Sequence, residues 1–105
     1  MDRRKHARFA TSFSPVLVSF SGEAVGTGKL YDVSPGGCKI DSNVTPPLGA
    51  SLTLRLSISD HAQPVVIDAG IVGWTIKNKY FGVKFSTIKP AEQHALNRYL
   101  AALYK

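Results

Sequence analysis

The sequence has a single cysteine, Cys38, in 105 residues, and three widely spaced histidines, His6, His61 and His94. One thiol excludes an internal disulfide, and these residues have none of the short ligand spacings of a metal site. We therefore expect no bound metal and a buried, inert Cys38 that packs like a small hydrophobic residue. This cysteine usage fits a reduced, cytosolic compartment.

Long apolar segments are also missing, since no run approaches the roughly 20 residues that a membrane-spanning helix needs. The segment FATSFSPVLVSF, which follows the basic start, is interrupted by Ser12, Ser14 and Pro15. It therefore lacks the continuous hydrophobic region of a signal peptide. We expect a cytoplasmic protein without membrane insertion. Its 44% hydrophobic residues exclude a disordered composition and suffice for one modest core.

Acidic residues are few, and the basic ones are unevenly placed. Lys and Arg total 13 against 7 Asp and Glu, which gives a net charge of +6 and favours anionic partners. Three of the five arginines, Arg3, Arg4 and Arg8, lie within the first eight residues, MDRRKHAR. Common catalytic signatures are absent from the sequence: it has no G-x-S-x-G, no H-E-x-x-H and no glycine-rich phosphate loop. We therefore expect a binding protein and not an enzyme.

Most of the chain has the pattern of short β-strands. In SLTLRLSIS (51–59), apolar residues alternate with polar ones, which predicts a strand with one buried face. Five more strands are predicted from apolar, β-branched and aromatic content, over 15–20, 27–33, 38–41, 65–74 and 80–85. Gly70 interrupts the strand over 65–74 and indicates a bulge or bend there.

The C-terminal segment has helical periodicity instead. Apolar side chains recur there at i, i+3, i+4 and i+7, namely at Leu96, Tyr99, Leu100 and Leu103. Six strands followed by one helix predict an all-β fold, a small six-stranded antiparallel β-barrel with the helix over an open end or edge. We expect one domain over 1–105, with an N-terminal loop over 1–14, the barrel over 15–86 and the helix over 89–104.

A marked turn signal lies in YDVSPGGCKI. Asp32, Ser34 and Gly37 have the spacing D-x-S-x-x-G, with Pro35 and Gly36 between them. Proline followed by glycine predicts a turn between two strands, with type II geometry favoured. Gly37 then either permits a close approach of backbone or ligand, or supplies a positive φ.

Taken with the R-x-x-x-R spacing of Arg4 and Arg8, this turn resembles the paired signatures of the PilZ domain, a bacterial receptor domain for cyclic di-GMP. GIVGW with FGVKF is similar to the last strand pair of that family, and KPAEQHALNRYL is similar to its C-terminal helix, so almost the whole chain is covered. The resemblance implies a barrel with a flexible N-terminal loop that closes over the ligand. It also implies cyclic di-GMP as the ligand, bound by Arg4, Arg8, Asp32, Ser34 and Gly37.

The residue types suit that ligand, which has two phosphate charges and two guanine bases. An arginine fork pairs with phosphate oxygens or with guanine O6 and N7, and its plane stacks on a base. An ionised Asp32 only accepts hydrogen bonds, so it can receive the N1–H and N2–H groups of guanine together. The Ser34 hydroxyl can add one bond to base or phosphate.

Three further residues are secondary candidates. In this family the position of Arg3, just before the first motif arginine, bears on whether one nucleotide or a stacked pair of nucleotides is bound, and an arginine is compatible with the pair. Lys39 could attract phosphate or simply be a solvated strand residue, and Trp74 could stack on the ligand or pack at the barrel edge. Lys5 and His6 are interpreted as solvated bystanders.

The hypothesis that accounts for both motifs is a monomeric cyclic di-GMP receptor that orders its N-terminal segment on binding and signals to a protein partner. Motility, adhesion, biofilm or exopolysaccharide control are the processes that the resemblance suggests. One alternative is a basic small-barrel protein that binds nucleic acid. Another is a PilZ-like adaptor that binds proteins without the nucleotide.

Overall fold

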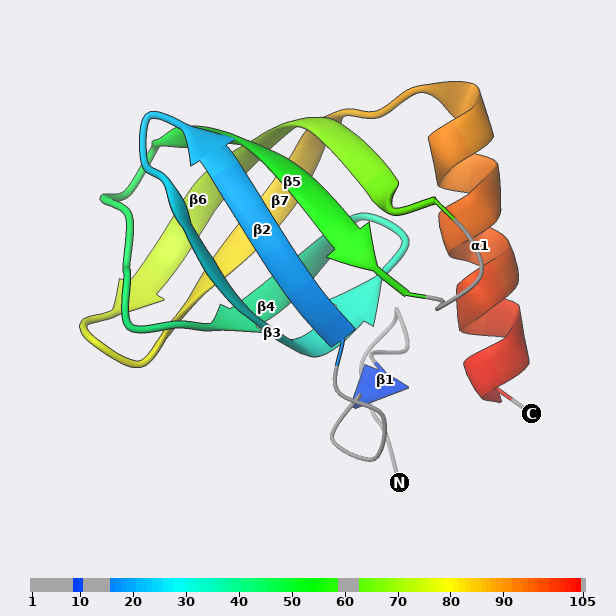
Figure 1. The fold of residues 1–105 in the computed structure, drawn as a ribbon, viewed down its shortest axis with the longest axis horizontal. Coiled ribbons are helices and arrows are strands. Elements are labelled where there is room, and N and C mark those ends of the chain that lie inside the picture. The colour runs from blue at the N-terminus through cyan, green and yellow to red at the C-terminus, as the bar shows by residue number, and fades with distance from the viewer. Residues whose placement is uncertain (1–8, 11–15, 59–62, 105) are drawn as a thin grey trace.

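The computed structural model describes residues 9–10, 16–58 and 63–104 and shows a β-barrel with a helix at one end (Figure 1). Seven strands precede the helix. They are β1 (Phe9–Ala10), β2 (Val16–Gly22), β3 (Gly26–Ser34), β4 (Gly37–Asp41), β5 (Ser51–Ser57), β6 (Val65–Ile76) and β7 (Tyr80–Thr87), followed by α1 (Pro90–Tyr104). Within the described ranges, no helix is long and apolar enough to cross a membrane.

Six of these strands form a closed antiparallel barrel. The order β3-β2-β5-β6-β7-β4 is completed by pairing of β3 with β4, which leaves no long free edge between them. The six-stranded barrel and the C-terminal helix expected from the sequence are confirmed. The two-residue strand β1 is an addition: it pairs with β3 from within the segment 1–14, where a loop was expected.

The core follows the alternation of apolar residues. Leu52, Leu54 and Leu56 of β5 are buried, while Thr53 is half-buried and Arg55 is exposed. The strand ends at Ser57, two residues earlier than predicted. Opposite β5, strand β6 has one extra residue between Ile67 and Gly70, so the bulge or bend expected at Gly70 is confirmed.

Helix α1 closes one end of the barrel with its apolar stripe. Leu96 and Leu100 are buried in the common core, and Tyr99 packs against that core. Burial raises the pKa of the Tyr99 phenol above its usual value because the charged form is desolvated. The stripe predicted from the sequence is therefore the helix face that covers the barrel end, whereas the side chain of Leu103 is outside the described residues.

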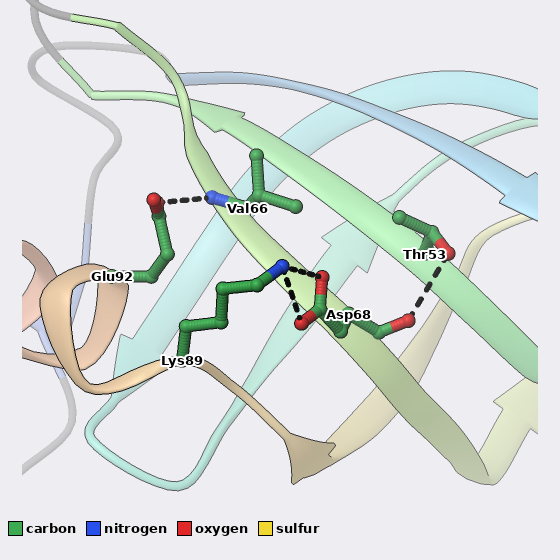
Figure 2. Close-up of polar contacts among 5 residues, drawn as sticks. All are labelled: Thr53, Val66, Asp68, Lys89 and Glu92. Carbon is green, nitrogen blue, oxygen red and sulfur yellow. Dashed lines mark hydrogen bonds and ion pairs between the residues drawn. The ribbon is translucent and has the colours of Figure 1, made fainter.

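The first turn of α1 and the residue before it are tied to β6 by two polar contacts (Figure 2). Glu92 Oε1 accepts a hydrogen bond from the Val66 amide at 2.8 Å, and Lys89 Nζ lies 3.1 Å from Asp68 Oδ2. Pro90 begins the helix, one residue later than the predicted start at position 89. A lysine just before a helix N-terminus is unfavourable for the helix dipole, and Lys89 has Asp68 as its compensating partner.

Candidate functional site

The D-x-S-x-x-G sequence forms the hairpin between β3 and β4. Ser34 and Gly37 are register partners, Pro35 and Gly36 make the two-residue turn, and Ser34 Oγ donates to Gly37 O at 3.4 Å. The turn was predicted, but its type II geometry was wrong. Type II needs a positive φ at Gly36, and the described glycines with positive φ are Gly22 and Gly49.

Gly37 is required by close packing of the backbone. A Cβ placed on it would lie 2.6 Å from the carbonyl oxygen of Val83 in β7, closer than real Cβ atoms come. Its φ is not positive. Of the two roles that the sequence left open, close approach is therefore the one realised, and it lets β4 lie tightly on β7.

Asp32 owes its position to a β-bulge. Leu30 pairs with Ile40 and Asp32 pairs with Lys39, so Tyr31 is an extra residue on β3. Two consecutive residues, Tyr31 and Asp32, thereby stand between the buried Leu30 and Val33. A bulge re-aims side chains in this way, and here it turns an aromatic ring and a half-buried carboxylate out of the core together.

Strand β1 brings the N-terminal segment to the same place. Phe9 pairs with Val33 and Ala10 pairs with Asp32, so β1 runs beside the second half of β3. The R-x-x-x-R residues Arg4 and Arg8, and Arg3, lie outside the described residues, as do Lys5 and His6. Phe9, the residue that follows Arg8 in the sequence, lies beside the strand that leads into the signature hairpin.

Lys39 lies in a cluster of aromatic rings, which we call the aromatic–lysine cluster: Tyr31, Lys39, Trp74 and Tyr80. The Lys39 ammonium is 4.2 Å from the Tyr31 ring centre, 4.1 Å from that of Tyr80 and 5.8 Å from that of Trp74. The two tyrosine rings are nearly parallel, at 11°. Such cation–π contacts hold the ammonium in one place while leaving its charge available.

Trp74 marks the border between this cluster and a hollow on the barrel surface. Its ring packs edge-on against Tyr80 and covers Gly82, where any Cβ would overlap the indole nitrogen. The Trp74 side chain nevertheless remains 39% exposed. Trp74 therefore packs at the barrel edge, one of the two roles considered for it, and stacking of its exposed ring on a ligand stays a prediction.

The hollow is a cavity of about 720 Å³, within the usual range for small-molecule sites. It is lined by the signature hairpin, by β6 and β7 and by the helix, through Ser34, Pro35, Gly36, Gly37, Cys38, Gly73, Trp74, Gly82, Val83, Lys84, Gln93 and Asn97. Ser34, Gly37 and Trp74 of the predicted site thus share one cavity. Asp32 and Lys39 are not in its lining and stand on the neighbouring bulge.

Sequence reasoning missed Lys84, Gln93 and Asn97 in this lining. Gln93 Nε2 donates to Pro35 O at 3.2 Å, across 58 residues of sequence. Helix positions 93 and 97 have no motif, and only their one-turn spacing on the polar side of the apolar stripe could have suggested a common role.

Of the cysteine and the three histidines, Cys38 and His94 lie within the described residues. Cys38 is a buried thiol, as predicted. Among residues 9–10, 16–58 and 63–104, no group of three His, Cys, Asp or Glu side chains could hold a metal. His94 is exposed on α1, and His6 and His61 lie outside the described residues.

Comparison with known proteins gives a family match and several structural ones. The family model described as the PilZ domain matches residues 2–102. A search of curated protein sequences finds no significant match.

Three solved structures illustrate the fold likeness. The inhibitor of motility of Bacillus subtilis, MotI/DgrA, has TM-score 0.73 and 19% identity, over 97% of this chain and 51% of that one. The PilZ domain with c-di-GMP of YcgR from Escherichia coli has TM-score 0.71 and 17% identity, over 98% of this chain and 92% of that one. The K. pneumonia MrkH–c-di-GMP complex has TM-score 0.73 and 17% identity, over 99% of this chain and 52% of that one. The chain therefore spans about half the length of MotI and MrkH.

Proposed function

The chain belongs to the PilZ domain family, and from this premise we propose that it is a receptor module for cyclic di-GMP. The observation that carries the proposal is the pairing of β1 with β3. It brings the residue after Arg8 opposite Val33, in the strand that leads into the D-x-S-x-x-G hairpin. The two signatures are 24 residues apart, counted from Arg8 to Asp32, and this pairing supports a single binding site formed by both.

The roles follow from the chemistry of each group. Arg4 and Arg8 grip phosphate or the O6 and N7 edge of guanine, since a guanidinium fork matches both. Asp32 accepts the N1–H and N2–H donors of a guanine. Ser34 lines the cavity and offers its hydroxyl, while Gly37 keeps β4 close to β7 so that the hairpin has its shape.

Two secondary roles belong to the same proposal. Lys39 adds a positive charge that Tyr31 and Tyr80 hold on the outer face, and Trp74 offers a ring for stacking at the cavity border. Arg3 supplies the extra charge that a stacked pair of nucleotides, with four phosphates, would need. The stoichiometry of binding tests that last role directly.

Binding is proposed to order the arginine segment over the barrel, which changes the surface that a protein partner reads. MotI is named an inhibitor of motility, and MrkH and YcgR are described in complex with c-di-GMP. Control of motility is accordingly the first process to examine for this chain, before adhesion, biofilm or exopolysaccharide. A cytoplasmic location and a monomeric state stay predictions from the sequence.

The test is calorimetric titration of the full chain with cyclic di-GMP, using Arg4→Ala, Arg8→Ala and Asp32→Ala, with Arg55→Ala as the matched control. Each site variant should bind about 10- to 100-fold more weakly, because charge-assisted hydrogen bonds contribute about 1.5–3 kcal/mol each. Arg55 is exposed on β5, in a strand that contributes nothing to the cavity, so its variant should bind like the wild type. Absence of binding heat, together with unchanged NMR signals of residues 3–8, would contradict the proposal.

The nucleic-acid alternative has one observation in its favour, the aromatic–lysine cluster, because bases stack on exposed rings beside a positive charge. Single-stranded oligonucleotides should be titrated across a range of salt concentrations. An oligonucleotide affinity that cyclic di-GMP does not displace, with no cyclic di-GMP binding, would favour this alternative over the receptor.

A further inference from the structure

Two amide side chains on α1 form a wall of the cavity that neither signature includes. Gln93 and Asn97 are one helical turn apart, and both line the cavity together with Pro35. Gln93 Nε2 donates to Pro35 O at 3.2 Å and to Asn97 Oδ1 at 3.0 Å. The signature hairpin and the helix are therefore joined by a short chain of hydrogen bonds.

This chain of bonds determines which way each amide points. The Pro35 carbonyl oxygen can only accept, so Gln93 must present its nitrogen to it, and the same nitrogen then faces Asn97 Oδ1. Both hydrogens of Gln93 Nε2 are used in these bonds. Within the described part of the chain, Gln93 Oε1 and Asn97 Nδ2 take no part in a hydrogen bond, so the wall offers one acceptor beside one donor.

The wall is also held in position before any ligand arrives. Glu92, the residue before Gln93, is bonded to the Val66 amide, and Lys89 is paired with Asp68 (Figure 2). Leu96, the residue before Asn97, is fully buried in the core. The helix backbone that carries the two amides is therefore fixed, and the hydrogen bonds of Gln93 orient its side chain and that of the exposed Asn97. Such preorganisation favours affinity and selectivity.

We propose that Gln93 and Asn97 recognise the lactam edge of one guanine of cyclic di-GMP, a proposal that rests on the receptor function above. Gln93 Oε1 accepts the N1–H of the base, and Asn97 Nδ2 donates to its O6. Adenine presents the reverse polarity, with an amino donor and a ring acceptor at these two places. Asp32 is absent from the cavity lining. In this proposal its carboxylate therefore accepts hydrogen bonds from the other guanine of the ligand.

The experiment measures the affinity of the full chain for cyclic di-GMP and cyclic di-AMP in Asn97→Ala, Asn97→Asp and Gln93→Ala. His94→Ala is the control, since His94 is exposed on the same helix and does not line the cavity. Each substitution by alanine should weaken cyclic di-GMP binding about fivefold, the usual effect of losing one hydrogen bond. Asn97→Asp should weaken it more, because it replaces the donor by a charged acceptor.

The ratio of the two affinities separates recognition from a merely structural role. All three variants should lower the preference for cyclic di-GMP over cyclic di-AMP, with thermal midpoints close to that of the wild type for the two Asn97 variants. If the wild type binds cyclic di-GMP and the variants keep both its affinity and its preference, the inference is wrong while the receptor function stands. If the wild type binds no cyclic di-GMP, both are wrong.

Discussion

The two sides of this barrel are built by different rules. Strands β2 and β5 pair without interruption from Leu17↔Ser57 to Gly22↔Leu52. By contrast, the pairs β3–β4 and β6–β7, which lead to the candidate site, carry register shifts at Tyr31, at Gly70 and beside Trp74. We call these the regular side and the site side.

The difference shows how a small barrel makes room for a ligand. On the regular side, buried residues alternate with half-buried or exposed ones, and the surface has a smaller hollow, of about 450 Å³, lined by Leu17, Ser19 and their neighbours. On the site side, bulges bring consecutive residues to the surface, and glycines let strands and rings approach the backbone. The site side is therefore less regularly packed, and it exposes backbone, aromatic rings and the Lys39 charge at the surface.

The largest expected effect comes from the core of the regular side. Leu54→Ala removes a fully buried side chain of β5 and should lower the free energy of unfolding by about 2–5 kcal/mol. Arg55→Ala, one residue along on the exposed face, should change it by less than about 0.5 kcal/mol. Urea denaturation measures both. Equal effects of the two substitutions would contradict the assignment of the two faces.

An intermediate effect is expected within the signature hairpin. Gly37→Ala would bring a methyl group against Val83 O and should lower the free energy of unfolding by about 1–3 kcal/mol. Gly36→Ala meets nothing within 4 Å and has no positive φ, so it should be neutral or stabilising by up to about 1 kcal/mol. Thermal unfolding of the two variants compares their stabilities directly. If Gly36→Ala were as destabilising as Gly37→Ala, the conformation of the turn, and not the packing of β4 on β7, would determine the stability of the hairpin.

The smallest effect concerns charge on the two sides. Lys39→Met should weaken cyclic di-GMP binding about fivefold, because its ammonium is held by two tyrosine rings beside the proposed site. Lys29→Met, at the far end of β3 in the smaller hollow that β3 shares with β2 and β5, should leave the affinity unchanged. Titrations at low and high salt should show the difference shrinking as salt screens the charge. Equal losses in both variants would mean that overall net charge, and not position, matters.

Local patterns were enough for much of the fold. The alternation in β5, the apolar stripe with Leu96 and Leu100, and the interruption at Gly70 each reflect contacts within one element or with its nearest partner. They were predictable because period and backbone freedom depend on neighbouring residues. The extra residue at Tyr31 was not predictable, because a bulge depends on the register of two strands. The local sequence YDV carries no signal for it.

By itself, the sequence determined the family, the six strands and helix, and the two motifs, because these depend on residue type and spacing. Only the tertiary structure decided which surfaces those motifs share. It gathered Tyr31, Lys39, Trp74 and Tyr80 from four different strands, and it joined Gln93 to Pro35 across 58 residues. Such contacts arise when the barrel closes and the helix docks on it, because covering the core brings distant segments together. The spacing of residues along the chain does not encode these contacts.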